Sequence, residues 1–141
     1  GGASEDDAQL LYDFGVRMGL AFQLQDDYLD VYGDPAVFGK KIGGDILCNK
    51  KTYMLITALE KADTQTRREL LDWIAASNYV PSSKIEAVTA IYNKVGIGEI
   101  CQQKIDQYYE EAKALLEKVS VEDALKQNLM DFVLKLMNRK L

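Results

Sequence analysis

The chain has 141 residues, of which 48% are hydrophobic, and its formal net charge is -5. That length suits one domain with a sizeable core, because a chain of roughly 150 residues buries about two-thirds of its extended surface. The acidic balance argues against nucleic acid or an anionic membrane as a general partner. No run reaches the roughly 18 apolar residues of a membrane-spanning helix, and residues 1–7 lack signal-peptide character, so we expect a soluble, cytoplasmic protein.

The sequence contains no histidine and two cysteines, Cys48 and Cys101, which are far apart in it. A structural zinc site needs about four cysteine or histidine ligands, so these two thiols cannot supply one alone. Two reduced thiols are expected, and a single disulfide stays open. The missing histidine also removes the common serine and cysteine triads. Any metal site must therefore use oxygen ligands.

Long runs of helix-forming residues and only two prolines predict an all-α fold, an antiparallel helical bundle formed by one segment over residues 1–141. Glycine suits the closing position of a helix and proline prevents its resumption, so Gly33-Asp34-Pro35 should end the first helix. The expected elements are a helix over 7–32, an ordered loop over 36–49, helices over 50–61 and 64–76, and a helix opened by a capping box, Ser83-Lys84-Ile85-Glu86, and broken by Gly96 and Gly98.

Two further helices are predicted from apolar residues spaced alternately four and three apart. Such stripes form the core seams of a helical bundle. Ser120 with Asp123 is expected to cap the second of these helices. The stripes are Cys101, Ile105, Tyr108, Ala112, Leu115 and Val119 in the first helix, and Leu125, Leu129, Phe132 and Leu136 in the second.

The segment most informative about chemistry is residues 22–30. In a helix, Gln23, Asp26, Asp27 and Asp30 fall at positions i, i+3, i+4 and i+7, so they form one narrow polar stripe. A solvated face is the simplest explanation of three aspartates on a helix.

The residues that precede this stripe on the same side of the helix argue against a solvated face. At about 100° per residue, Tyr12, Val16 and Gly19 lie on the same line one to three turns earlier, and the other faces are apolar. A helix that is apolar all round is usually buried. The aspartates are therefore expected at the end of a central helix, facing a cavity with apolar walls.

Three close carboxylates repel one another unless a cation neutralises them. The negative end of the helix dipole adds to that preference for a cation. Oxygen ligands without nitrogen or sulfur indicate Mg²⁺, or Mn²⁺, which keeps water ligands and shares phosphate oxygens.

The following loop supplies the opposite charge. Lys40, Lys41, Lys50 and Lys51 flank its glycines. A Mg²⁺-bound diphosphate remains anionic, and lysine is a suitable partner for it. A metal–diphosphate site is coherent with this pattern, and a surface ion-pair loop is the alternative.

Several linked elements follow one another here: Gly19-Leu20-Ala21-Phe22-Gln23-Leu24-Gln25-Asp26-Asp27-Tyr28-Leu29-Asp30, Gly33-Asp34, Gly39-Lys40, Gly44-Asp45 and Lys50-Lys51-Thr52. In order and spacing they resemble the second aspartate-rich region of the trans-prenyltransferases. These enzymes are the farnesyl, geranylgeranyl and longer polyprenyl diphosphate synthases. The resemblance is densest over residues 15–59 and looser at Tyr108-Tyr109-Glu110-Glu111-Ala112 and Arg139-Lys140.

The resemblance implies a head-to-tail condensation. An allylic diphosphate ionises, isopentenyl diphosphate attacks the carbocation, and Mg²⁺ ions assist the leaving diphosphate as Lewis acids. An aromatic face near the carbocation would be attractive, although core packing explains Phe22 at least as well. The implied roles are metal binding for Asp26, Asp27 and Asp30, contact with the allylic diphosphate for Lys40 and Lys50, lining of the site for Gln23 and Phe22, and support of a metal or a lysine for Asp45.

Other parts of the family's site do not occur in these 141 residues: a first aspartate-rich motif, an upstream arginine pair, and the basic residues that hold isopentenyl diphosphate. The chain also opens at Gly1 without a methionine. We therefore expect the C-terminal half of a prenyltransferase, inactive by itself. The product length cannot be predicted, because the residues that set it in this family lie near the first motif.

Two other functions fit parts of the pattern. One is a non-catalytic helical subunit, regulatory or for assembly, that kept the fold. The other is a terpene cyclase, whose usual second motif of Asn, Ser/Thr and Glu is not seen here. A half-bundle exposes an apolar face, so dimerisation is expected around Tyr12, Val16 and Leu20.

Overall fold

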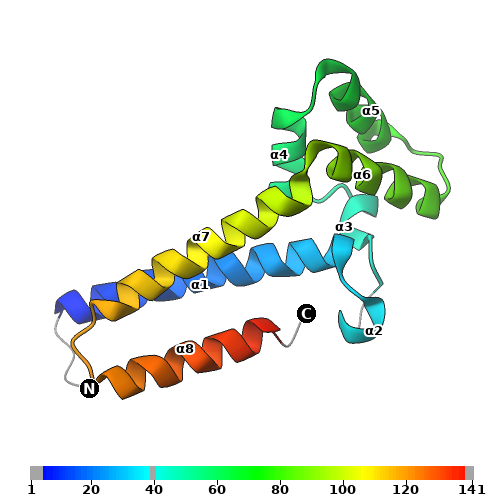
Figure 1. Cartoon of the computed structure of the whole chain (residues 1–141). Coiled ribbons are helices and arrows are strands. Elements are labelled where there is room, and N and C mark those ends of the chain that lie inside the picture. Colours follow the sequence, from blue (N-terminus) through cyan, green and yellow to red (C-terminus); the bar gives the residue numbers. More distant parts are fainter. Residues whose placement is uncertain (1–4, 39–40, 139–141) are drawn as a thin grey trace. The chain divides into compact units, whose positions relative to one another are not determined.

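The structure is a computed structural model that describes residues 5–38 and 41–138 (Figure 1). Within these ranges the regular elements are all helices, which confirms the all-α prediction. None of these helices combines the length and the apolar composition needed to cross a membrane. The helices are α1 (Glu5–Tyr32), α2 (Pro35–Phe38), α3 (Gly44–Leu47), α4 (Tyr53–Lys61), α5 (Thr64–Ala75), α6 (Pro81–Val95), α7 (Ile97–Glu117) and α8 (Asp123–Asn138).

The chain forms two compact units. Unit 1 comprises residues 1–25 and 103–141, and unit 2 comprises residues 26–102. Helices α1 and α7 each contribute to both units. The interpretation of residues 1–141 as one domain stays a prediction.

In unit 1, α8 runs antiparallel to the C-terminal part of α7 and lies beside α1 (Figure 1). Asp7, buried near the start of α1, accepts a hydrogen bond from the backbone N–H of Ser120 at 3.0 Å, which ties α1 to the turn before α8. The core consists of Phe14, Met18, Ala21 and Leu24 of α1, Ile105, Ala112 and Leu116 of α7, Val119 of the following turn, and Met130 and Val133 of α8.

One predicted seam is wrong. On α8, Leu125 and Phe132 are each 58% exposed, whereas Met130 and Val133 are buried. Both sets have helical spacing, so the packing against neighbouring helices decides which one is buried. The side chain of Leu136 lies outside the described residues. The stripe predicted for the preceding helix holds. Cys101, Ile105 and Ala112 of α7 and Val119 of the following turn are buried, and Tyr108 and Leu115 of α7 are half-buried.

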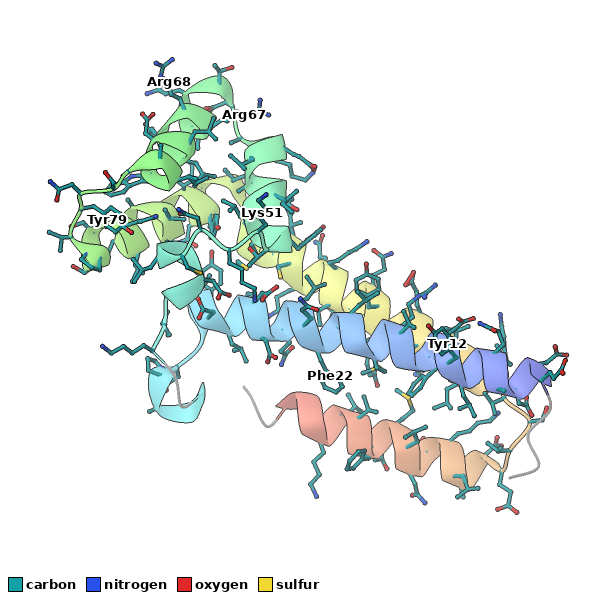
Figure 2. All side chains as sticks on the ribbon, turned by 180° about the vertical axis from the view of Figure 1, so that it is seen from behind. Tyr12, Phe22, Lys51, Arg67, Arg68 and Tyr79 are labelled. Atoms are coloured by element: carbon teal, nitrogen blue, oxygen red, sulfur yellow. The ribbon has the colours of Figure 1, made fainter. Side chains whose placement is uncertain are left out.

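The expectation that α1 is buried on all sides is also wrong. Tyr12 is 68% exposed, and Val16, Gly19 and Leu20 are exposed as well (Figure 2 labels Tyr12). The described residues of unit 1 thus leave an apolar face of α1 uncovered. The interpretation of the chain as half of a bundle stays a prediction.

Unit 2 is built around α6, which α3, α4 and α5 contact. Proline is favoured in the first turn of a helix, where its missing N–H needs no partner. Accordingly α6 begins at Pro81 after Val80, with no side-chain cap, so the capping box at Ser83 is wrong. Pro35 begins α2 for the same reason and does not prevent a helix there.

Two other predicted boundaries need revision. The predicted loop over residues 36–49 includes one-turn helices, among them α3. Gly96 does end α6, in a left-handed conformation with φ of 78°. Gly98 lies inside α7, where an added Cβ would come within 3.4 Å of the Tyr32 ring. It serves close packing and does not break the helix.

Gly43 is the tightest point of unit 2. Its φ is +98°, a region that disfavours side chains, and an added Cβ would lie 2.5 Å from the Cδ1 atom of Ile85. We expect Gly43→Ala to lower the free energy of unfolding by about 1–3 kcal/mol, through strain and overlap together. Urea unfolding followed by circular dichroism measures this change.

Gly15→Ala is the matched control, because a Cβ on this helical glycine of α1 meets nothing within 4 Å. It should raise the free energy of unfolding by about 0.5–1 kcal/mol. Equal unfolding midpoints for the two variants would contradict the strain assigned to Gly43.

The two cysteines are free thiols, as predicted; Cys48 is exposed and Cys101 is buried. Burial, with a smaller contribution from the negative charge of Asp27, raises the pKa of Cys101 to about 12. An unfolded thiol ionises near pH 8.5, so above about that pH ionisation lowers the free energy of the unfolded state and not that of the folded state. This thiol therefore stabilises the fold fully below about pH 8.5 and less as the pH rises from there towards 12.

We expect iodoacetamide at pH 8 to alkylate Cys48 at least about a hundredfold faster than Cys101, because the thiolate is the reacting form. Mass spectrometry of timed samples measures both rates. Under denaturing conditions the two rates should converge, and comparable rates in the folded chain would refute the assigned burial.

Candidate functional site

The last turns of α1, within unit 2, carry the three predicted aspartates. Asp27 is only 5% exposed, and Asp26 and Asp30 are half-buried. A buried carboxylate is costly unless it has a partner. A plain solvated face therefore does not describe this end of the helix.

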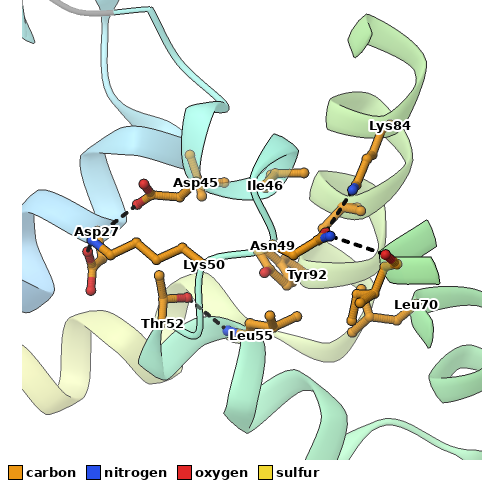
Figure 3. A pocket seen from close by; sticks show the side chains of 13 residues that line it. Asp27, Asp45, Ile46, Asn49, Lys50, Thr52, Leu55, Leu70, Lys84 and Tyr92 are labelled. Atoms are coloured by element: carbon orange, nitrogen blue, oxygen red, sulfur yellow. Dashed lines mark hydrogen bonds and ion pairs between the residues drawn. The ribbon is translucent and has the colours of Figure 1, made fainter. Parts of the chain in front are cut away.

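Lys50 is the partner of Asp27. Its Nζ atom lies 3.2 Å from Oδ1 of Asp27 and 3.9 Å from Oδ2 of Asp45 (Figure 3). The hydrogen bond to Asp27 and the charge of that carboxylate raise the pKa of Lys50. The lysine side chain is 47% exposed, so its ammonium group can also reach a ligand from solvent.

Asp30 binds the segment that follows α1. Its backbone oxygen accepts a hydrogen bond from the N–H of Gly43 at 2.7 Å, and its Oδ2 accepts one from the N–H of Asp45 at 2.9 Å. The N–H of Lys50 then donates to the backbone oxygen of Asp45 at 2.9 Å. With the Asp27–Lys50 pair, these bonds bring Asp27, Asp30, Asp45 and Lys50 together, and their roles in a binding site stay predictions.

The other predicted site residues are not placed there by the structure. Lys40 lies outside the described residues. Gln23 is exposed, and Phe22 is half-buried and projects from α1 on the side of α8 (Figure 2). Both belong to unit 1, so their roles stay predictions.

A small cavity lies behind the Asp27–Lys50 pair (Figure 3). Its volume is about 20 Å³, about that of one water molecule. Its walls are partly apolar, with Ile46, Leu55, Leu70 and Val88. Of the three aspartates expected to face a cavity with apolar walls, only Asp27 lines this one.

The sequence interpretation missed three polar residues that line this cavity. Asn49 has φ of 55°, Lys84 is 1% exposed, and Tyr92 is 3% exposed. Burial raises the pKa of Tyr92, so the phenol stays protonated at neutral pH. The asparagine before a lysine was a usable signal, since asparagine tolerates left-handed backbone; nothing in the sequence distinguished Lys84 from a solvated lysine.

The donor set fits a hard divalent cation, because the gathered side chains offer carboxylate oxygens. Over residues 5–38 and 41–138, however, no three histidine, cysteine or acidic side chains form a group that could hold a metal ion. Mg²⁺ is commonly held by one or two carboxylates plus waters and phosphate oxygens. The arrangement suits a Mg²⁺–diphosphate complex better than an all-protein metal cage.

Comparison with known proteins gives a consistent result. The polyprenyl synthetase family model matches residues 1–95. A short chain isoprenyl diphosphate synthase of Methanothermobacter thermautotrophicus is 34% identical over 137 residues, which cover 96% of this chain and 41% of the relative. Farnesyl pyrophosphate synthase of Gallus gallus is 37% identical over 107 residues, which cover 74% of this chain and 28% of the relative. The chain thus spans less than half the length of these curated relatives.

Solved structures agree. A crystal structure of a geranylgeranyl pyrophosphate synthase matches with a TM-score of 0.89 and 39% identity, over 99% of this chain and 44% of that one. A second structure is that of a geranylgeranyl pyrophosphate synthase from Corynebacterium glutamicum complexed with isoprenyl diphosphate and magnesium. It matches with a TM-score of 0.83 and 30% identity, over 98% of this chain and 39% of that one. Family model, sequence relatives and fold all agree, and the chain belongs to the polyprenyl synthetase family.

Proposed function

We propose that this chain supplies one half of the Mg²⁺–diphosphate site of a trans-prenyltransferase, which condenses isopentenyl diphosphate with an allylic diphosphate. The observation that carries the proposal is the buried carboxylate of Asp27 paired with the half-exposed ammonium of Lys50, at 3.2 Å. Acidic and basic groups side by side match a ligand that is itself a cation bound to an anion. The Corynebacterium glutamicum relative, with isoprenyl diphosphate and magnesium bound, supports this assignment.

In this proposal the Asp27–Lys50 ion pair is the ligand-free state of the site, and each residue changes its partner when the ligand binds. Lys50 turns from Asp27 towards a phosphate oxygen, and Asp45 at 3.9 Å keeps the ammonium group nearby. Asp27 then faces the cation with Asp26 and Asp30, directly or through water. Lys40 adds a second positive charge, Gln23 lines the site, and Phe22 offers an aromatic face.

Magnesium, when bound, supplies the Lewis acid that helps the allylic diphosphate to leave. The residues of this chain hold and orient the complex. The family's first aspartate-rich motif does not occur in the sequence, so we expect no prenyl transfer by the 141 residues alone.

Calorimetric titration of the chain with inorganic diphosphate, with and without Mg²⁺, tests the site. We expect binding that requires Mg²⁺ and that weakens at least about tenfold in Asp26→Asn/Asp27→Asn and in Lys50→Met, since each removes a charged contact. The control is Asp72→Asn, an exposed aspartate of α5, which should bind like the unaltered chain.

Binding of equal strength without Mg²⁺, or in the double aspartate variant, would overturn the proposal. A folded chain that binds no diphosphate would favour the alternative of a non-catalytic helical subunit, in which Asp27–Lys50 is only a structural ion pair.

We also propose that the chain associates through the uncovered face of α1 around Tyr12, Val16 and Leu20, because contiguous exposed apolar surface favours association. Sedimentation velocity should show a dimer or larger species, and Val16→Glu should shift it towards monomer. Val80→Glu, at an exposed valine of unit 2, is the control and should leave the distribution unchanged. A strictly monomeric profile of the unaltered chain at high concentration would rule this association out.

A further inference from the structure

Lys84 is a buried lysine that the proposed site does not use. It belongs to α6, is 1% exposed, and lines the small cavity behind Lys50. Its Nζ atom donates a hydrogen bond to Oδ1 of Asn49 at 2.7 Å and lies 4.7 Å from the centre of the Tyr79 ring (Figure 3 shows the hydrogen bond). An ammonium group is costly to bury, so these contacts must compensate for the hydration that it loses.

Asn49 is held from two helices. Its Oδ1 accepts from Lys84 of α6, and its Nδ2 donates to the backbone oxygen of Ile74 of α5 at 3.1 Å. Its backbone is left-handed, with φ of 55°, and it is the one non-glycine residue with positive φ in the part of the chain that the structure describes. Such a backbone persists where surrounding contacts enforce it.

Lys50 follows directly. Its N–H donates to the backbone oxygen of Asp45 at 2.9 Å, and its own oxygen accepts from the N–H of Thr52 at 2.9 Å. A half-exposed lysine side chain is flexible, so the direction in which its ammonium group points depends on where this backbone is held. The residue immediately before it is the one that Lys84 fixes.

We propose that Lys84 is a positioning residue: by fixing Asn49 in its left-handed conformation, it sets the backbone from which Lys50 reaches Asp27 and, in the proposed function on which this part rests, the diphosphate. The connection runs from the ammonium group of Lys84 through the Asn49 side chain to the Lys50 backbone. Lys84 does not touch the ligand.

Lys84→Met separates this role from mere packing. Methionine fills a similar volume and needs no hydrogen-bond partner, but it removes the donor to Oδ1 of Asn49, so a loss of global stability is expected beside the local effect. Asn49→Gly is the second variant, because glycine adopts the left-handed backbone freely but lacks the amide that binds Lys84 and Ile74.

Amide hydrogen exchange, measured without any ligand, tests whether Lys84 fixes the backbone at Lys50. In both variants the amides of Lys50 and Thr52 should exchange about tenfold faster or more, beyond any change in global stability, as expected for the loss of a hydrogen bond from a charged donor. Amides in the middle of α6 are the internal reference. Lys94→Met, at an exposed lysine of the same helix, is the control and should leave the exchange rates of the Lys50 and Thr52 amides unchanged.

Calorimetry with Mg²⁺ and inorganic diphosphate tests the functional part. Lys84→Met and Asn49→Gly should each weaken binding about tenfold, and the double variant should bind no more weakly than either single one, because both interrupt one connection. Additive losses would show that the two residues act separately and would overturn the inference.

The two experiments distinguish the possible failures. Unchanged exchange at Lys50 in folded Lys84→Met overturns the inference, and if that variant does not fold, the same result in Asn49→Gly does. If Lys50→Met abolishes binding while Lys84→Met binds normally, the inference fails and the proposed function stands. If the unaltered chain binds no diphosphate but exchange rises as expected, the proposed function fails, and Lys84 still positions the Lys50 backbone.

Discussion

Within unit 2, Asp30 holds the segment that follows α1 against the last turns of that helix with two hydrogen bonds. Its backbone oxygen binds the N–H of Gly43, and its carboxylate binds the N–H of Asp45. Gly43 can come this close because it has no side chain, and Ile85 of α6 fills the space that a Cβ would need. One turn therefore connects the aspartates of α1, the short helix α3 that carries Asp45, and the helix α6 around which unit 2 is built. The positions of Lys50 and of the small cavity depend on this turn.

The Asp27–Lys50 pair joins a buried carboxylate to a half-exposed ammonium group, so it is neither a surface ion pair nor a fully buried one. Lys50 compensates for the hydration that the carboxylate loses on burial. In the proposed function a cation–anion complex replaces this pair, and each charge then has a new partner of the same sign as the old one. Lys84 and Tyr92, which line the small cavity, are buried, and Asn49 is half-buried. Breaking the hydrogen bond between Lys84 and Asn49 would leave a polar group without a partner.

The sequence predicted the helices best where they are long and periodic, and the site best where its residues are close in sequence. The spacing of Asp27 and Asp30 alone places them within one turn of the helix, whereas the resemblance to the trans-prenyltransferases implied that Asp45 and Lys50 belong to the same site. Errors arose where two patterns competed. The predicted capping box at Ser83 does not begin the helix, because Pro81, two residues earlier, has a fixed φ that suits the first helical position. On α8 the predicted seam of Leu125 and Phe132 was exposed, because Met130 and Val133 form an equally periodic face.

The sequence by itself determined the fold class, the oxygen-only character of any metal site, and the pairing of an acidic helix end with a basic loop, since these follow from residue type and short-range spacing. Only the tertiary structure decided that Asp27 is buried against Lys50, that Asn49 takes a left-handed backbone, and that Lys84 is enclosed beside it. The physical reason is that burial and partners come from segments distant in sequence: Lys84 lies 35 residues after Asn49, and nothing local marks a lysine whose ammonium group will be covered by another helix.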